Sequence, residues 1–101
     1  MSNVLQYQLP EGFLASRNAA IPHRNQLERA FSDENVSKVY LDLRKVNAIS
    51  ESYADEIFGV LVQEFGLDEV LEKLKINNAS DFVIKNIAIV IDRRARASCP
   101  S

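Results

Sequence analysis

Few side chains in this sequence have the type and spacing that catalysis requires. His23 is the only histidine, and its place beside Pro22 at the start of an expected helix favours a surface or capping role. The sequence contains no Gly-x-Ser-x-Gly motif that would hold a nucleophilic serine. The three glycines, at positions 12, 59 and 66, are too isolated to form a phosphate-binding loop. Spacing typical of metal ligands is also absent, so we expect no metal and no cofactor.

Asp55 and Glu56 form one adjacent pair of carboxylates, in the clearest predicted helix of the chain. Adjacent side chains diverge on a helix, so the pair is not arranged for acid–base chemistry, and we expect a protein that is not an enzyme. The helix is predicted over 52–65. Ser52, three residues before Asp55, fits the N-terminal capping box, and Gly66 fits a left-handed C-terminal cap.

The predicted helix has two unlike faces at about 100° per residue. Its apolar side chains share one arc that we expect to pack on a sheet: Tyr53, Ala54, Ile57, Phe58, Val60, Leu61 and Phe65. The opposite arc is polar and contains Glu51, Ser52, Asp55, Glu56, Gly59 and Gln63. We predict that this polar arc, together with Ser50, binds a protein partner.

Gly59 lies near the middle of the polar arc and costs about 1 kcal/mol of helix propensity relative to alanine. Two explanations stay open. A bare backbone at Gly59 would let a partner approach closely, or it would avoid a clash with the first helix of the chain itself.

Strands and helices alternate along the rest of the chain. Turn residues at 10–12 separate two short strands, which predicts a hairpin. Ser80 is a good N-cap for the last helix. The predicted elements are strands 4–9 and 13–15, a helix from Pro22 to Phe31, an inner strand 38–43, the helix 52–65, a further turn 67–71, a strand 73–77 with its lysines facing outward, and a helix 81–95.

This order, β-β-α-β-α-β-α, predicts an α/β fold class: a small mixed sheet with helices packed against it. It would form one domain over 1–101, with a core over 4–95 and a polar tail at 96–101. Residues 86–91 also have the composition of a terminal strand. If they are helical, Val83 and Ile84 share a face with Ile87, whereas Phe82 and Ile89 fall on a second apolar face that needs a cover.

Composition and charge exclude several classes of protein. Hydrophobic residues make up 47% and charged residues 26% of the 101 residues, a balance typical of a globular domain. No apolar run is long enough to cross a membrane. A single cysteine, Cys99, forms no internal disulfide and fits the reducing cytoplasm. Residues 46–72 hold seven acidic and no basic side chains, which argues against nucleic acid as the main partner.

The segment between the inner strand and the polar-faced helix carries a family resemblance. A strand ending in Leu41-Asp42-Leu43, a short loop with Val46 and Ile49, and a serine-rich helix start resemble the STAS domains (sulfate transporter and anti-sigma factor antagonist). The sequence is similar, more closely, to the small STAS-like domain family of unknown function, whose members carry a Ser-aromatic-Ala-Asp-Glu sequence like that at 52–56.

Two further segments fit the same family, Gly-Phe-Leu-Ala-Ser-Arg at 12–17 and Leu-Lys-Ile-Asn-Asn at 74–78, so the resemblance covers roughly residues 10–95. It implies a small mixed sheet with packed helices and a regulatory role through protein contacts. It also implies a histidine-kinase-like ATPase as the partner.

The resemblance points to a candidate phosphoacceptor. In the anti-sigma factor antagonists the equivalent loop reads Asp-Ser-Ser-Gly, and a kinase-like anti-sigma factor phosphorylates the second serine. By this resemblance Ser50 takes the place of the aspartate and Glu51 that of the first serine. Ser52 takes the place of the phosphoacceptor and Tyr53 that of the glycine; only Ser52 matches by residue type. A phosphate on Ser52 would be repelled by the acidic residues around it, since the nearest basic residue in sequence is Lys45.

Other functions and assemblies stay open at this stage. Some STAS domains are thought to bind nucleotides, which makes a small nucleotide-binding protein the alternative. A nucleic-acid-binding, antitoxin-like protein would use Arg93, Arg94 and Arg96. The sequence also leaves a homodimer open.

Overall fold

Two separate parallel sheets are found in the computed structural model, which describes residues 3–98. The larger sheet has the order β1-β3-β5, formed by Asn3–Gln8, Val36–Asp42 and Leu74–Asn77. The smaller sheet pairs β2 (Gly12–Leu14) with β4 (Val46–Ile49). The predicted α/β class is therefore confirmed, but every pairing between the described strands is parallel rather than mixed.

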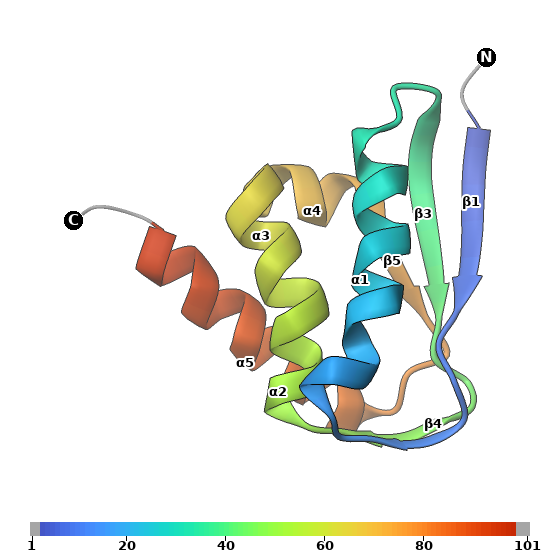
Figure 1. The fold of residues 1–101 in the computed structure, drawn as a ribbon, viewed down its shortest axis with the longest axis vertical. Coiled ribbons are helices and arrows are strands. Elements are labelled where there is room, and N and C mark those ends of the chain that lie inside the picture. The colour runs from blue at the N-terminus through green and yellow to red at the C-terminus, as the bar shows by residue number, and fades with distance from the viewer. Residues whose placement is uncertain (1–2, 99–101) are drawn as a thin grey trace.

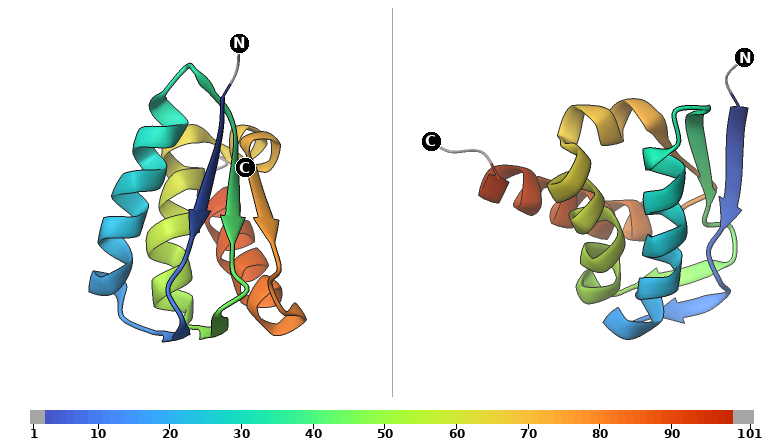
Figure 2. Two further views of the ribbon diagram at one scale, coloured as in Figure 1. Left: turned by 90° about the vertical axis from the view of Figure 1, so that its right-hand side faces the viewer. Right: turned by 45° about the horizontal axis from the view of Figure 1, so that its top comes forward.

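The helices lie on one side of the larger sheet (Figures 1 and 2). Three consecutive segments run as one long helix in the middle of the chain: α2 (Glu51–Ala54), the π-helical segment η1 (Asp55–Gly59) and α3 (Val60–Phe65). The other helices are α1 (Arg17–Ser32), α4 (Leu67–Lys73) and α5 (Asp81–Ser98). The core lies between the helices and the sheet, and its largest fully buried side chains include Tyr53, Phe58, Leu27, Leu41, Ile57, Leu61 and Ile87.

The predicted hairpin at the start of the chain is wrong. β1 lies parallel to β3, with Leu5 beside Val39, and β2 lies parallel to β4. β4 itself was expected to be a loop. The alternation of apolar and polar residues identifies a strand but not its partner, and both true partners lie far along the chain.

α1 begins at Arg17, well before the expected start at Pro22. The side chain of Ser16 caps it by accepting a hydrogen bond from the amide of Ala19, at 3.4 Å. Pro22 therefore lies inside the helix, where the carbonyl of Asn18 loses its helical donor. Pro22 and Asn18 are both exposed, so water can hydrogen-bond that carbonyl.

The long helix ends at Phe65 as predicted, and Gly66 has a positive φ of 89°. Its ψ of 153° is not that of the left-handed cap expected from the sequence. The further turn extends to Lys73, which is not on the outward face of a strand. Lys73 ends α4 and is buried, and its Nζ donates to the carbonyl of Phe31 at 3.0 Å. The ammonium group thus binds the C-terminal end of α1, where carbonyls lack helical donors.

The last helix is confirmed, and Ser80 caps it by accepting from the amide of Val83 at 3.2 Å. Residues 86–91 are helical, not a strand. Ile84 was expected on the buried face, but its side chain is 45% exposed. Phe82 and Ile89 are also exposed, so the second apolar face of this helix lacks a cover within the described chain. α5 continues to Ser98, so residues 96–98, expected in a polar tail, are helical. Cys99 lies outside the described residues.

Within residues 3–98 no helix is both long and apolar enough to span a membrane.

Candidate functional site

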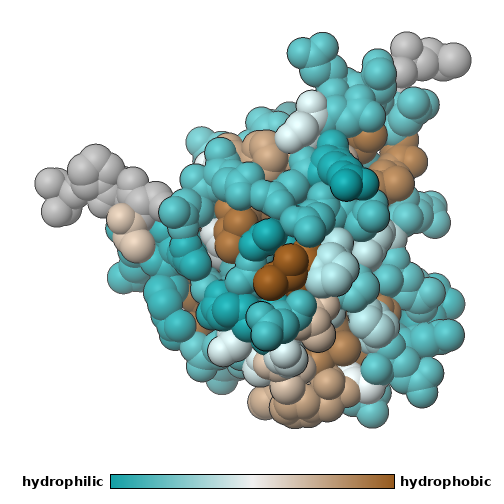
Figure 3. Space-filling view, viewed as in Figure 1, coloured by the Kyte–Doolittle hydropathy of each residue, from teal (hydrophilic) through white to brown (hydrophobic). Residues whose placement is uncertain are grey.

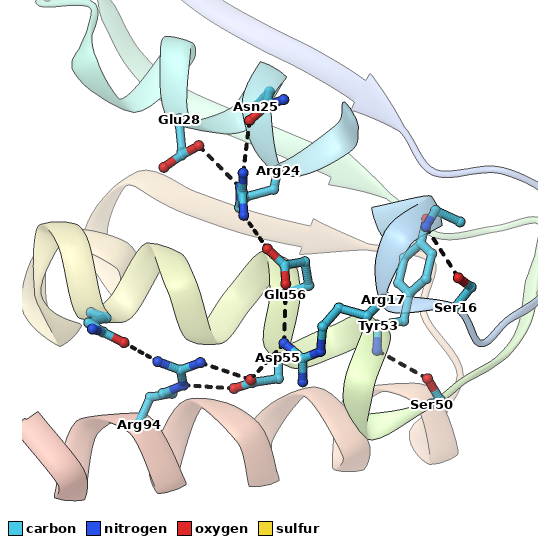
Figure 4. Close-up of polar contacts among 12 residues, drawn as sticks. Ser16, Arg17, Arg24, Asn25, Glu28, Ser50, Tyr53, Asp55, Glu56 and Arg94 are labelled. Carbon is cyan, nitrogen blue, oxygen red and sulfur yellow. Dashed lines mark hydrogen bonds and ion pairs between the residues drawn. The ribbon is translucent and has the colours of Figure 1, made fainter. Parts of the chain in front are cut away.

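Three of the seven predicted site residues line one hollow, where the starts of α1 and α2 meet the C-terminal half of α5. The hollow has a volume of about 560 Å³. Its lining consists of Arg17, Glu51, Ser52, Asp55, Arg93, Arg94 and Ala97. The sequence predicted Glu51, Ser52 and Asp55 here, whereas the arginines come from two other helices, α1 and α5. Figure 4 shows Arg17 and Arg94 beside Asp55.

Ser50, not Ser52, is the N-cap of α2. Ser50 Oγ accepts a hydrogen bond from the amide of Tyr53 at 3.0 Å and donates one to the carbonyl of Ala15 at 2.7 Å. The capping prediction for Ser52 is therefore wrong by two residues. Ser52 lies one residue inside the helix, and its side chain is exposed to the hollow. A hydroxyl there is free of the capping role.

Asp55 is held by arginines from both neighbouring helices. Its two carboxylate oxygens accept from Nε and Nη2 of Arg94 at 2.9 Å each, and Oδ2 also accepts from Nη1 of Arg17 at 3.2 Å. The hydrogen bonds from Arg94 are the largest cause that lowers the pKa of Asp55. The same contact raises the pKa of Arg94. Asp55 thus joins α1 and α5 to the long helix as a stable anion.

Glu56 is buried, although the sequence placed it on an exposed arc. Its carboxylate accepts from Nη1 of Arg17 at 3.1 Å and from Nη1 of Arg24. Asp55 and Glu56 both contact Nη1 of Arg17, so these two adjacent carboxylates share one arginine. A carboxylate buried in this way needs such partners, and Glu56 is not available to a docking protein.

Gly59 is also buried, and the structure replaces both explanations offered for it. A Cβ atom at this position would overlap Oδ1 of Asp55 and lie 2.9 Å from Cγ of Arg94. The close neighbour is therefore the last helix rather than the first helix or a partner. Gly59 leaves the room in which Arg94 reaches Asp55.

The two outer members of the predicted surface remain exposed and are bound to arginines of α5. Glu51 Oε1 accepts from Nη2 of Arg93 at 2.8 Å, and the Gln63 amide oxygen accepts from Nη1 of Arg94. Arg96 pairs with Asp92 at 3.0 Å on its own helix. The three arginines that a nucleic-acid-binding function would use are thus all engaged by side chains of the chain itself.

His23 contributes a contact that the sequence did not reveal. Its Nδ1 lies 2.7 Å from the hydroxyl of Tyr7, and its ring lies near the buried ring of Tyr53. Burial lowers the pKa of His23 and raises the pKa of Tyr53 to about 12. These neutral rings join β1, α1 and α2, a structural role rather than the surface or capping role expected.

No local signal pairs the arginines with their carboxylates, because Arg17, Arg24 and Arg94 lie 38, 32 and 39 residues from their acidic partners. The acidic segment 46–72 indicates that basic residues elsewhere in the chain could pair with it, but not which ones. Among the described residues, no group of three or more His, Cys, Asp or Glu side chains could hold a metal ion.

The chain is a small α/β domain in which a long helix has a serine near its start and is bound by arginines from neighbouring helices. Residues 21–83 match the family described as a STAS-like domain of unknown function. The chain therefore belongs to this STAS-like family, as its sequence resemblance indicated. No curated protein and no solved structure matches the chain significantly.

Proposed function

We propose that this STAS-like domain is a non-enzymatic regulatory protein that binds a protein partner at the hollow, with Ser52 as its phosphoacceptor. The observation that carries the proposal is the position of Ser52. Its exposed side chain lies in the first turn of α2, in a hollow that Arg17, Arg93 and Arg94 also line. STAS-like domains are generally non-enzymatic, which supports a role through protein contacts.

The arginines change the electrostatic expectation for a phosphate on Ser52. In the sequence the phosphate has only acidic neighbours, but in the folded chain three guanidinium groups line the same hollow. The arginine easiest to recruit is Arg93, because its pair with Glu51 is exposed on both sides, at 61% and 55%, and exposed pairs contribute little. Phosphorylation would draw Arg93 from Glu51 and leave the better-buried pair of Asp55 and Arg94 in place.

The change in surface charge is the proposed signal. A phosphate adds nearly two negative charges at neutral pH, and Glu51 would lose its pairing at the same time. A partner bound through cationic groups would gain affinity, and one bound through Arg93 would lose it. The helix-covered face is suited to polar recognition, since Figure 3 shows it mostly hydrophilic, with hydrophobic residues in separate patches.

A histidine-kinase-like ATPase is the partner we propose, on the strength of the resemblance to the anti-sigma factor antagonists. The test incubates the chain with ATP and a purified histidine-kinase-like ATPase from the same organism, followed by mass spectrometry of the peptide around Ser52. Phosphate on Ser52, lost in Ser52→Ala and retained in the matched control Ser37→Ala, supports the proposal. Ser37 is an exposed serine in β3.

Binding measurements with the same ATPase separate partner recognition from phosphorylation. We expect wild type to bind, Ser52→Asp to bind with a changed affinity, and Ser37→Asp to bind like wild type. If the ATPase neither binds nor phosphorylates the chain, this partner is wrong. If it binds but leaves Ser52 unmodified, and Ser52→Asp binds like wild type, the phosphorylation switch is wrong.

A further inference from the structure

The outward face of α5 combines exposed apolar side chains with an ordered set of charges. Phe82, Ile84 and Ile89 are 63%, 45% and 38% exposed. Figures 1 and 2 show the C-terminal part of α5 projecting beyond the other helices. At about 100° per residue, five residues lie along the middle of this outward face: Asp81, Lys85, Ala88, Asp92 and Arg96. The buried side chains of α5, Val83, Ile87 and Val90, lie on the opposite side.

The four charged residues on this face alternate so that an antiparallel copy of the helix places each one opposite a residue of opposite charge. Around a centre between Ala88 and Ile89, Asp81 lies as far from the centre as Arg96, and Lys85 as far as Asp92. Two copies of α5 packed antiparallel would therefore place Asp81 against Arg96 and Lys85 against Asp92, each pairing twice. A parallel pair would instead place like charges together. Within the described chain, neither Asp81 nor Lys85 takes part in an ion pair, and Arg96 pairs only with Asp92.

We infer that the outward face of α5 binds a second copy of this chain in an antiparallel, two-fold symmetric dimer. A symmetric interface uses the same patch on both subunits, which is what the reversed charge order provides. The small side chain of Ala88 at the centre lets the two helices approach closely. Ile89 then lies opposite Ala88 of the second copy and next to its Ile89, and Phe82 lies near Arg96 of the second copy, an arrangement that permits a cation–π contact.

The same arrangement accounts for the apolar side chains that α5 leaves exposed. Single apolar residues on a surface need no explanation, but Phe82 and Ile89 lie together on one flank of the charged residues. Ile84 lies on the opposite flank. A pair of single helices buries an area at the low end of stable interfaces, so the dimer should be concentration-dependent. The inference concerns a different face of α5 from the hollow and does not depend on Ser52.

The test measures the mass of the full chain in solution by sedimentation equilibrium, at low salt and ~100 μM, where a micromolar dissociation constant gives mainly dimer. We expect a dimer for wild type and a monomer for Ile89→Asp. Leu71→Asp is the matched control, because Leu71 is another exposed apolar residue, on α4, and we expect it to remain dimeric. Circular dichroism confirms that each variant is folded.

A charge exchange tests the antiparallel register. Lys85→Glu places like charges opposite each other at two symmetric positions and should raise the dimer dissociation constant at least tenfold. Adding Asp92→Lys restores opposite charges only if the helices are antiparallel, and should recover dimerisation. A monomeric wild type at this concentration overturns the proposal and leaves the face to another protein. A dimer unaffected by Ile89→Asp, or a charge exchange without recovery, also overturns it.

Discussion

Replacing Gly59 with alanine sets helix propensity against the ion pair of Asp55 and Arg94. Alanine in place of glycine within a helix should raise the free energy of unfolding by about 1 kcal/mol. In this chain the new Cβ would overlap Oδ1 of Asp55 and lie 2.9 Å from Cγ of Arg94. The carboxylate is held in that place by two hydrogen bonds from Arg94 at 2.9 Å, so it can move only by weakening them.

The weakened ion pair should outweigh the gain in helix propensity, so that Gly59→Ala lowers the free energy of unfolding. A hydrogen bond to a charged group contributes about 1.5–3 kcal/mol. The side chains of Asp55 and Arg94 are 17% and 28% exposed, so solvent screening favours the low end of that range. Losing about 2 kcal/mol of pairing and gaining about 1 kcal/mol of propensity gives Gly59→Ala a net destabilisation of about 1 kcal/mol. The melting temperature should fall by about 4–8 °C.

Urea denaturation of four proteins completes the test: wild type, Gly59→Ala, Asp55→Ala and the double variant. Without the Asp55 carboxylate, Arg94 loses the partner that holds it, so its Cγ can move away from the new methyl group. Gly59→Ala should then stabilise the Asp55→Ala background by up to about 1 kcal/mol. The coupling between the two sites is the difference between the two effects. If Gly59→Ala stabilises wild type as much as it stabilises Asp55→Ala, the explanation of Gly59 is refuted.

Three more predictions concern the caps and the ion pairs. Ser50→Ala should lower the free energy of unfolding by about 2 kcal/mol, because it removes both the N-cap of α2 and the hydrogen bond to the loop between β2 and α1. Ser52→Ala should change the free energy of unfolding by less than about 0.5 kcal/mol. Equal urea midpoints for the two variants would contradict the capping assignment. The pKa of Asp55 is lowered on folding, so its ionised form stabilises the fold above the unfolded pKa, and this contribution is lost as pH falls through the folded value. The stability difference between wild type and Asp55→Asn should therefore shrink below about pH 4, and a difference that grows on acidification would rule this out. Lys73→Met keeps the packing of the stem but leaves the carbonyl of Phe31 without its donor, which should cost about 1–3 kcal/mol; a wild-type midpoint would show that the ammonium does not stabilise the end of α1.

Helix ends and buried helix faces were predicted well from residues that lie close together in the sequence. Gly66 ends the long helix because glycine adopts the positive φ found there at no steric cost. Ser80 caps α5 because its hydroxyl accepts a hydrogen bond from the amide of Val83, three residues later. The apolar arc that includes Ile57 and Leu61 faces the core as expected. In each case the residues that fix the structure lie within one or two turns of each other.

The errors occurred where a distant residue decides the structure. Ser50 and Ser52 are both acceptable caps by type, and the carbonyl of Ala15, which Ser50 also contacts, lies far away in sequence. The burial of Glu56 depends in the same way on Arg17 and Arg24. A polar arc was therefore predicted to be exposed although the fold covers its centre with arginines. The position of Ser52 at the start of the helix was predictable, but its arginine neighbours were not.

The parallel pairing of the strands also has a consequence for how the chain folds. β3 lies between β1 and β5, and neither neighbour is close to it along the chain: Leu5 lies beside Val39, and Leu41 lies beside Ile76. No described strand pair can form as a local hairpin, and contacts between distant residues slow folding. During synthesis, β3 emerges with only β1 available to it. Until β5 and α5 follow, one edge of β3 stays open, and a second nascent chain could pair with it.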